Sequence, residues 1–222
     1  MKPKVSTNDL DEPMAWAEVS VFCLRRPTSP RWVRVAIQDL GSVLADHAHC
    51  EVKAATTALS LALKNHEHLG IVEALTELAK EELDHFTRVV SFLERRQLPL
   101  GRPPVDLYAA RLRELTKALP PSALGPAVDR LLVGALIEAR SCERFKLLLD
   151  AWPAEEDPEL QAFYRELFEC EARHYVQYRT FAEQISGATA ERIEARLHLV
   201  ADAEARVIAE LETSLPKATV HG

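Results

Sequence analysis

One pattern constrains the fold of this chain more than any other: a glutamate precedes a Glu-x-x-His motif, and the same order then occurs again. The two motifs are Glu82-Leu83-Asp84-His85 and Glu171-Ala172-Arg173-His174. Residues three positions apart lie on one face of a helix. A carboxylate and an imidazole at this spacing can therefore hold one metal ion together.

The glutamates upstream of the two motifs have matching spacings. Glu51 precedes Glu82 by 31 residues, and Glu138 precedes Glu171 by 33 residues. Each interval is long enough for the rest of one helix, a turn and much of a returning helix. Each glutamate can therefore meet its Glu-x-x-His motif at one level of a helical bundle.

Apolar residues recur with helical periodicity through most of the chain and place the motifs on long helices. We expect core helices at about 35–65, 71–97, 126–149 and 158–185, and an extra helix at about 190–214. The long connection 98–125 has room for a short helix near 105–119. Four long helices with one long crossover predict an all-α, ferritin-like four-helix bundle with an extra terminal helix. We expect residues 1–222 to form a single domain of this kind.

The composition agrees with a helical protein and limits its environment. Only 7 glycines and 6% aromatic residues occur, while hydrophobic residues make up 47% of the chain. The net charge of −7 argues against a general affinity for nucleic acids, although a local basic patch remains compatible with it. The 4 cysteines do not have zinc-finger or C-x-x-C spacing. Without a signal peptide or a long apolar run, we expect a cytoplasmic protein with reduced thiols and no membrane contact.

The four carboxylates and two imidazoles predict a centre of two iron ions. Four carboxylates neutralise the four positive charges of two iron(II) ions, and carboxylates can bridge both ions. Manganese accepts the same ligands, so the identity of the metal is left open. The metal-free alternative requires several buried carboxylates to be protonated or paired.

Several nearby residues leave alternatives open. Glu143 is a rival to Glu138, because Cys142-Glu143 matches Cys50-Glu51 in the internal repeat. Glu138 lies on the apolar stripe and is the preferred choice, and a local π-bulge could turn both residues inward. We expect Tyr164 and Tyr178 to pack in the core, with a redox role as the alternative. His47 and His49 are expected at the surface or beside the ligands rather than as ligands themselves.

Four segments of the chain resemble the motifs of one enzyme family, the tRNA-(2-methylthio-N6-isopentenyladenosine) hydroxylases, or MiaE family. These segments are Leu44–Ala55, Glu81–Phe86, Leu136–Phe145 and Glu171–Tyr175. The resemblance implies a non-haem diiron monooxygenase that hydroxylates the isopentenyl side chain of a hypermodified adenosine beside the anticodon of tRNA. It also implies the metal ligands Glu51, Glu82, His85, Glu138, Glu171 and His174. Two electrons per turnover would come from an external electron-transfer partner.

Two basic runs are candidates for contact with tRNA phosphates. One spans 88–117, and the other consists of Arg25, Arg26, Arg31 and Arg34. An ordinary solvated helix face is the alternative for each run. The rival functions are a diiron hydroxylase of another substrate, such as a quinone, and an iron redox protein of the ferritin or rubrerythrin type.

Overall fold

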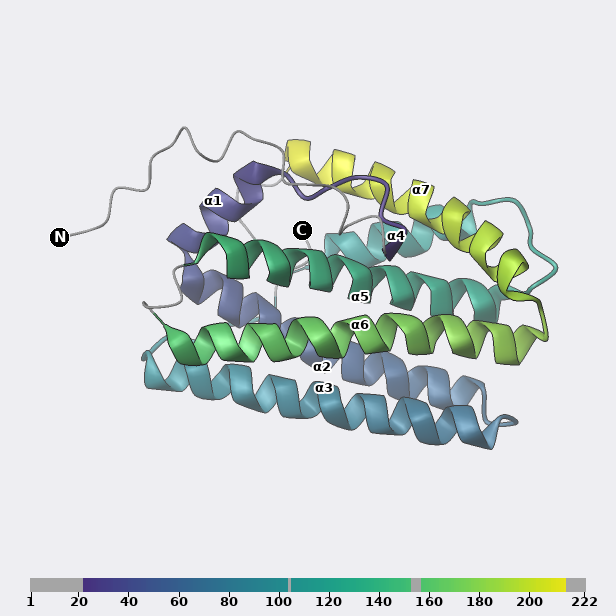
Figure 1. The fold of residues 1–222 in the computed structure, drawn as a ribbon, viewed down its shortest axis with the longest axis horizontal. Helices are drawn as coiled ribbons and strands as arrows, with labels where there is room; N and C mark the ends of the chain where they lie inside the picture. Colours follow the sequence, from purple (N-terminus) through teal and green to yellow (C-terminus); the bar gives the residue numbers. More distant parts are fainter. Residues whose placement is uncertain (1–21, 104, 153–156, 215–222) are drawn as a thin grey trace.

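The computed structural model describes residues 22–103, 105–152 and 157–214, and every regular element in these ranges is a helix. The elements are α1 (Pro30–Gln38), α2 (Leu40–Lys64), α3 (Leu69–Arg95), α4 (Leu107–Lys117), α5 (Pro126–Ala151), α6 (Pro158–Ser186) and α7 (Ala190–Ser214). Figure 1 shows α2 paired with α3 and α5 paired with α6, which together form the four-helix bundle. Helices α4 and α7 cover α5 on the side away from α3, and α1 lies at one end. This is the predicted ferritin-like architecture.

The first predicted helix is in fact two helices. We expected one helix over about 35–65, but the backbone breaks at Asp39, whose φ of −131° and ψ of 66° are not helical. The side chain of Asp39 accepts a hydrogen bond from the backbone N–H of Ser42 and so caps α2. Ser29 caps α1 in the same way, and Pro30 occupies its first turn. A cap inside an apolar stretch therefore separates α1 from α2.

The long connection between α3 and α5 is the single crossover of the bundle. It contains the short helix α4, which begins after Asp106, whose side chain accepts from the N–H of Ala109. Asp106 also lies 3.4 Å from Nζ of Lys53, which ties the start of α4 to the middle of α2. The crossover thus carries the chain along the bundle before α5 begins at Pro126.

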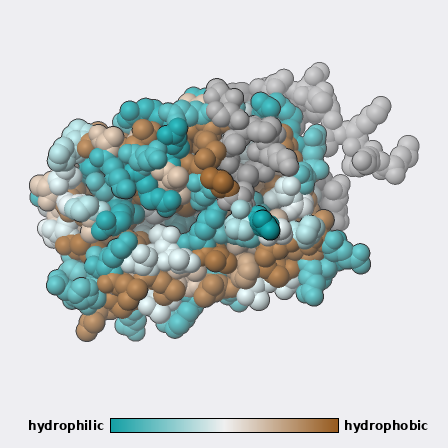
Figure 2. Space-filling model, turned by 180° about the vertical axis from the view of Figure 1, so that it is seen from behind, coloured by the Kyte–Doolittle hydropathy of each residue, from teal (hydrophilic) through white to brown (hydrophobic). Residues whose placement is uncertain are grey.

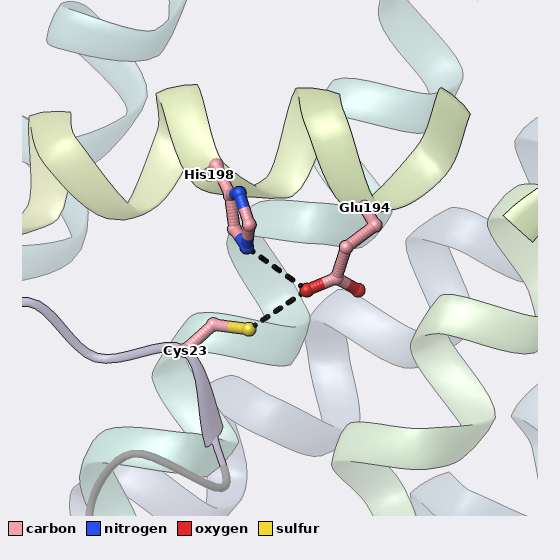
Figure 3. Close-up of side chains that lie close together, drawn as sticks. All are labelled: Cys23, Glu194 and His198. Carbon is pink, nitrogen blue, oxygen red and sulfur yellow. Dashed lines mark hydrogen bonds and ion pairs between the residues drawn. The ribbon is translucent and has the colours of Figure 1, made fainter. Parts of the chain in front are cut away.

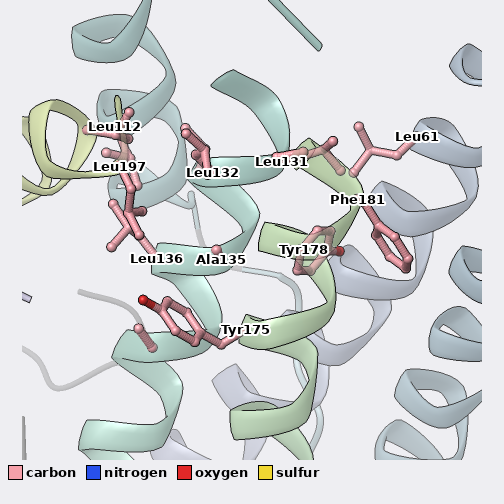
Figure 4. Packing of buried hydrophobic residues seen from close by; sticks show 14 of the residues in the cluster. Leu61, Leu112, Leu131, Leu132, Ala135, Leu136, Tyr175, Tyr178, Phe181 and Leu197 are labelled. Atoms are coloured by element: carbon pink, nitrogen blue, oxygen red, sulfur yellow. The ribbon is translucent and has the colours of Figure 1, made fainter. Parts of the chain in front are cut away.

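The interior contains two apolar clusters, one toward each end of the bundle. One joins α1 and the start of α2 to the ends of α3 and α5, through residues such as Trp32, Leu44 and Phe92. The other joins α4 and α7 to the first half of α5. Figure 4 shows Leu112 of α4 and Leu197 of α7 packed beside Leu132 and Leu136 of α5. The candidate metal ligands lie between these two clusters.

The surface carries some exposed apolar side chains. Figure 2 shows that brown, apolar residues gather on the lower part of the rear face, where the α2–α3 pair lies. Leu63 and Leu69, on either side of the α2–α3 turn, are 78% and 76% exposed. Among the described helices, none combines the length and apolar character needed to cross a bilayer.

Candidate metal centre

The six predicted ligand residues come together in the middle of the bundle. Helix α2 supplies Glu51, α3 supplies Glu82 and His85, α5 supplies Glu138, and α6 supplies Glu171 and His174. All six side chains are buried. Because every one of these helices is long and passes through the core, each predicted ligand projects from a helical backbone far from a helix end.

The six residues form two overlapping groups of possible metal ligands. One group consists of Glu51, Glu82, His85 and Glu171, and the other consists of Glu82, Glu138, Glu171 and His174. Within each group, the ligand atoms all lie within 4.8 Å of one another. The groups share Glu82 and Glu171, one from each Glu-x-x-His motif. Two ions placed in these groups would therefore have two carboxylates in common.

The imidazoles face the shared carboxylates with the same ring nitrogen. Nδ1 of His85 lies 3.4 Å from Oε2 of Glu82 and 3.8 Å from Oε1 of Glu171. Nδ1 of His174 lies 2.9 Å from Oε1 of Glu82 and 3.4 Å from Oε2 of Glu171. The two halves of the internal repeat thus present equivalent donor atoms to one space.

Several donor atoms in this space are buried and lack a hydrogen-bond partner in the described structure. They are Oε1 and Oε2 of Glu82, Oε2 of Glu171, Nδ1 of His85 and Nδ1 of His174. The 2.9 Å approach of His174 to Glu82 is close enough for a hydrogen bond, but the orientation of the groups does not make one. Buried polar atoms normally have partners, and a metal ion would provide one for all five atoms. The residues present therefore fit iron(II) or another oxygen- and nitrogen-preferring divalent cation.

The electrostatics of the cluster also reflect crowded carboxylates in a dry interior. Burial, and then the charge of Glu171, raises the pKa of Glu138 well above its ordinary value. Burial and the charge of Glu51 raise the pKa of Glu82. Burial alone would also raise the pKa of Glu51, but the adjacent His47 outweighs it and lowers this pKa to about 2. In the metal-free site, the carboxyl groups of Glu82 and Glu138 are thus harder to ionise than in water, and a bound cation would favour their charged forms.

Two further residues contact predicted ligands from outside the cluster. Nε2 of His47 lies 2.5 Å from Oε1 of Glu51, one helical turn away. The His47 ring is fully buried and stacks on Tyr164, with ring centroids 5.5 Å apart. Oε2 of Glu81 lies 3.0 Å from Nε2 of His174, which leaves Nδ1 of that ring facing the carboxylates. Such outer partners fix the tautomer and orientation of ligand side chains.

The structure separates Glu138 from its rival Glu143. Helix α5 is continuous and α-helical through both residues, so the π-bulge that we considered is not present. Glu143 points to the opposite side, where it accepts hydrogen bonds from the backbone N–H of Thr28 at 2.8 Å and its hydroxyl at 2.6 Å. Arg140 pairs with the same carboxylate.

The other singled-out side chains pack around the cluster. Tyr164 and Tyr178 are both buried, as expected for core packing. His47 is buried against Glu51, and His49 is half-buried. The cysteines neighbouring the ligands are free and buried: Cys50, Cys142 and Cys170.

The sequence interpretation missed a second buried polar cluster, centred on Arg140. Its guanidinium lies 2.8 Å from Oε1 of Glu204 on α7, and both side chains are fully buried. The hydroxyl of Tyr108 on α4 also donates to Glu204, at 3.1 Å. The sequence does contain a signal for this cluster: Glu204 lies between Val200 and Val207 on the apolar stripe of the last helix, where a buried charge needs a partner.

The fold and the cluster define a class, the ferritin-like bundles with a carboxylate- and histidine-rich centre between four helices. Comparison with known proteins narrows this class, since residues 16–219 match the family described as tRNA-(MS[2]IO[6]A)-hydroxylase (MiaE). The chain belongs to this family of hydroxylases, as the four motifs suggested.

Named relatives agree with this membership. The chain is 44% identical over 165 residues to the tRNA 2-(methylsulfanyl)-N(6)-isopentenyladenosine(37) hydroxylase of Pseudomonas putida, covering 74% of this chain and 77% of the relative. It is 32% identical over 234 residues to the Salmonella typhimurium hydroxylase of the same name, covering 83% of each chain. A solved structure, "Protein 43 with aldehyde deformylating oxygenase activity from Synechococcus", superimposes with a TM-score of 0.78 at 37% identity, covering 90% of this chain and 95% of that one.

Proposed function

We propose that this protein is a non-haem diiron monooxygenase that hydroxylates the isopentenyl side chain of a hypermodified adenosine beside the anticodon of tRNA. The observation that carries the proposal is the pair of ligand groups sharing Glu82 and Glu171, found in a chain of the MiaE family. The named relatives support the choice of substrate, because both are tRNA isopentenyladenosine hydroxylases. We further propose that residues 1–222 form one domain and act in the cytoplasm, where tRNA is modified.

Within this proposal, the six buried residues hold two irons. Glu51 and His85 would belong to one ion, Glu138 and His174 to the other, and Glu82 and Glu171 to both. When bound, the iron pair supplies the activation of oxygen that the side chains of the protein cannot perform themselves. The overall reaction consumes one C–H bond, one O2, two electrons and two protons, and it yields a C–OH group and water.

The chain's own residues orient the ligands and keep the site dry. Glu81 accepts the Nε2 proton of His174, which leaves Nδ1 free to bind a metal. His47 holds Glu51, and the rings of Phe145, Phe163 and Tyr164 surround this imidazole. An apolar lining of this kind excludes water from reactive oxygen chemistry. The sequence contains no flavin or iron–sulfur motif, so the electrons would come from a separate protein or reductant.

The ion pairs of the two basic runs indicate which arginines are available for tRNA phosphates. Several arginines of the first basic run are engaged in ion pairs: Arg88 with Glu166, Arg95 with Glu159, and Arg96 with Asp157. Arg25 and Arg26 pair with Asp202 and Glu212 on α7. Exposed Arg31 and Arg102 form no ion pair with the described residues. They lie at the same end of the bundle, because α1 packs on the start of α2 and the end of α3. We place the tRNA backbone at this end.

A reconstitution with purified components tests the proposed reaction. The protein is loaded with iron(II) and supplied with O2, a chemical reductant and tRNA carrying the prenylated adenosine, and the nucleosides are analysed by mass spectrometry. We expect one added oxygen atom on the prenylated nucleoside, absent with the His174→Ala variant. Matched reactions contain an aldehyde or a quinone instead of tRNA. Turnover of these compounds, with the nucleoside unchanged, would overturn the tRNA assignment and leave a diiron oxygenase of another substrate. Iron oxidation without any product would favour the storage role.

A further inference from the structure

A further group of side chains that could bind a metal ion lies outside the bundle core. Cys23 precedes α1, while Glu194 and His198 occupy adjacent turns of one face of α7. Sγ of Cys23 donates to Oε1 of Glu194 at 3.0 Å, and Nε2 of His198 lies 3.0 Å from the same oxygen. Figure 3 shows the three side chains converging from the N-terminal segment and α7. None of them belongs to the six proposed iron ligands.

Neighbouring residues hold this group in its converging geometry. Nη2 of Arg179 on α6 lies 2.6 Å from Oε2 of Glu194, so the other carboxylate oxygen, Oε1, faces the sulfur and the imidazole. The ring of Phe22 packs edge-on against Tyr175, with centroids 5.3 Å apart, which fixes the residue before Cys23. Burial and then the Glu194 carboxylate raise the pKa of the Cys23 thiol, so the metal-free sulfur remains protonated and donates its hydrogen bond.

We propose that Cys23, Glu194 and His198 form a binding site for one zinc ion, separate from the iron centre. Thiolate, imidazole and carboxylate are the usual protein ligands of zinc, and a thiolate distinguishes the site from the all-oxygen-and-nitrogen centre in the bundle. The thiolate and the carboxylate balance the two positive charges of the ion. Three protein ligands leave the fourth tetrahedral position to water.

The existing contacts require little rearrangement to accept the ion. Zinc–ligand bonds of roughly 2.0–2.3 Å in a tetrahedron separate neighbouring donor atoms by roughly 3.3–3.7 Å. The two separations from Oε1 of Glu194 are 3.0 Å, slightly shorter than this, and the three donor atoms all lie within 4.8 Å of one another, so replacing the thiol proton by zinc requires only small shifts. Half-burial of all three side chains keeps the site accessible to the ion.

The position of the site indicates a structural role. The Arg25–Asp202 and Arg26–Glu212 ion pairs already join the same N-terminal segment to α7, at 3.6 and 2.7 Å. A zinc ion bound by Cys23, Glu194 and His198 would add metal–ligand bonds between this segment and α7, next to the two ion pairs. The segment then leads to Thr28, which bonds Glu143 of α5. Zinc binding would therefore stabilise the packing of this segment against α7 and α5.

Cobalt(II) titration of the full-length protein tests the proposal, because cobalt replaces zinc and gives a sulfur-to-cobalt charge-transfer band only with a thiolate ligand. We expect a band that saturates at one thiolate-bound cobalt per chain and disappears on addition of zinc. Cys23→Ser should abolish the band. His198→Ala and Glu194→Gln should weaken cobalt binding by more than the 10- to 100-fold typical of losing an outer-shell partner.

Matched variants separate this site from other thiols, histidines and carboxylates. Cys142→Ala removes a buried thiol elsewhere, His66→Ala an exposed imidazole, and Glu191→Gln an exposed carboxylate one turn before Glu194. Each should retain the band. No band in the wild-type protein, or a band that survives in Cys23→Ser, would overturn the proposal. If Cys23→Ser does not fold, the surface variant His198→Ala decides the question. The iron content of the bundle is measured in parallel for the Cys23, Glu194 and His198 variants, and we expect it to be unchanged. The result for the zinc site is therefore independent of the result for the iron centre.

Discussion

His174 on α6 places Nδ1 2.9 Å from Oε1 of Glu82 on α3, although the two residues lie in different halves of the internal repeat. Neither atom has a hydrogen-bond partner in the described structure. This contact joins the two Glu-x-x-His motifs across the bundle, and it is the reason to treat the six residues as one centre rather than two.

Loss of a shared carboxylate should affect both metal ions. Because Glu82 belongs to both ligand groups, we expect Glu82→Gln to lower the iron content from two ions per chain to one or none. Loss of Glu51, which belongs to one group, should spare the other ion. Iron analysis after anaerobic loading and gel filtration measures the difference. Equal retention of both irons in Glu82→Gln would show that Glu82 is not a shared ligand.

Replacing Glu138 should stabilise the metal-free protein while weakening metal binding. Its carboxyl group is buried beside Glu171, an arrangement that costs free energy without a cation. We expect Glu138→Gln to raise the free energy of unfolding of the metal-free protein by about 1–2 kcal/mol. Urea denaturation with and without iron(II) measures both effects. Glu143→Gln is the contrasting variant, because it breaks bonds to Thr28 and Arg140 and should destabilise the protein.

Glu81 should matter for metal binding although it is outside the six ligands. Its carboxylate orients His174 through Nε2, and loss of such a partner typically costs 10- to 100-fold in metal affinity. We expect this range for Glu81→Ala in a competition titration with a chelator. Glu73→Ala, an exposed glutamate on the same helix, should bind metal normally. Normal binding by both variants would mean that Glu81 has no part in orienting the ring.

The Arg140–Glu204 pair should be far more important for stability than the surface pairs. Both side chains are fully buried, and without the Glu204 carboxylate the buried charge of Arg140 keeps only Glu143 as a charged partner among the described residues, a loss that costs about 3–5 kcal/mol. We therefore expect Glu204→Gln to lower the free energy of unfolding by about this amount, as measured in urea. A loss below 1 kcal/mol, the range of an exposed pair, would contradict this account.

The exposed Arg88–Glu166 pair gives a pH-dependent comparison. Two hydrogen bonds from Arg88 lower the pKa of Glu166 in the folded protein. Because the folded pKa lies below the unfolded value, the pair adds stability above about pH 4.5 and loses it as the pH falls through the folded pKa. Solvent screening limits the effect to about 0.2–1 kcal/mol. The deficit of Glu166→Gln at pH 7 should therefore vanish once the pH falls below the folded pKa of Glu166.

Charge reversal at the end of the bundle that carries Arg31 and Arg102 tests the tRNA surface. We expect the Arg31→Glu, Arg102→Glu double variant to bind tRNA more weakly and with a flatter salt dependence, because fewer counterions are released. Lys64→Glu, at the α2–α3 turn of the opposite end, is the control. Binding measured over a range of salt concentrations shows the result. Equal weakening by the control would point to a general charge effect.

The sequence predicted the elements of this fold well because long apolar stripes determine long helices. The predicted fourth helix at about 158–185 corresponds to α6, Pro158–Ser186, whose proline and Asp157 cap mark its start. The break at Asp39 was missed, because apolar residues continue on both sides of it and only the cap geometry reveals the new helix. Residues 1–21, which the single-domain prediction includes, lie outside the described parts of the chain.

The candidate ligands were predictable because helical periodicity determines which side chains of a helix point into the core. Glu138 could be preferred over Glu143 because one lies on the apolar stripe and the other lies well around the helix. The outer partners could not be found in this way. Glu81 is half exposed and reaches His174 from a neighbouring helix, and Cys23 meets Glu194 across 171 residues. Such contacts depend on how helices pack, which a single sequence does not specify.

Anomalous diffraction from crystals loaded with iron(II) under anaerobic conditions tests the central claim most directly. The account predicts two iron peaks between α2, α3, α5 and α6, both bonded to Glu82 and Glu171. One peak should also contact Glu51 and His85, and the other Glu138 and His174. A single peak, or two peaks that share neither Glu82 nor Glu171, would contradict the two-metal centre.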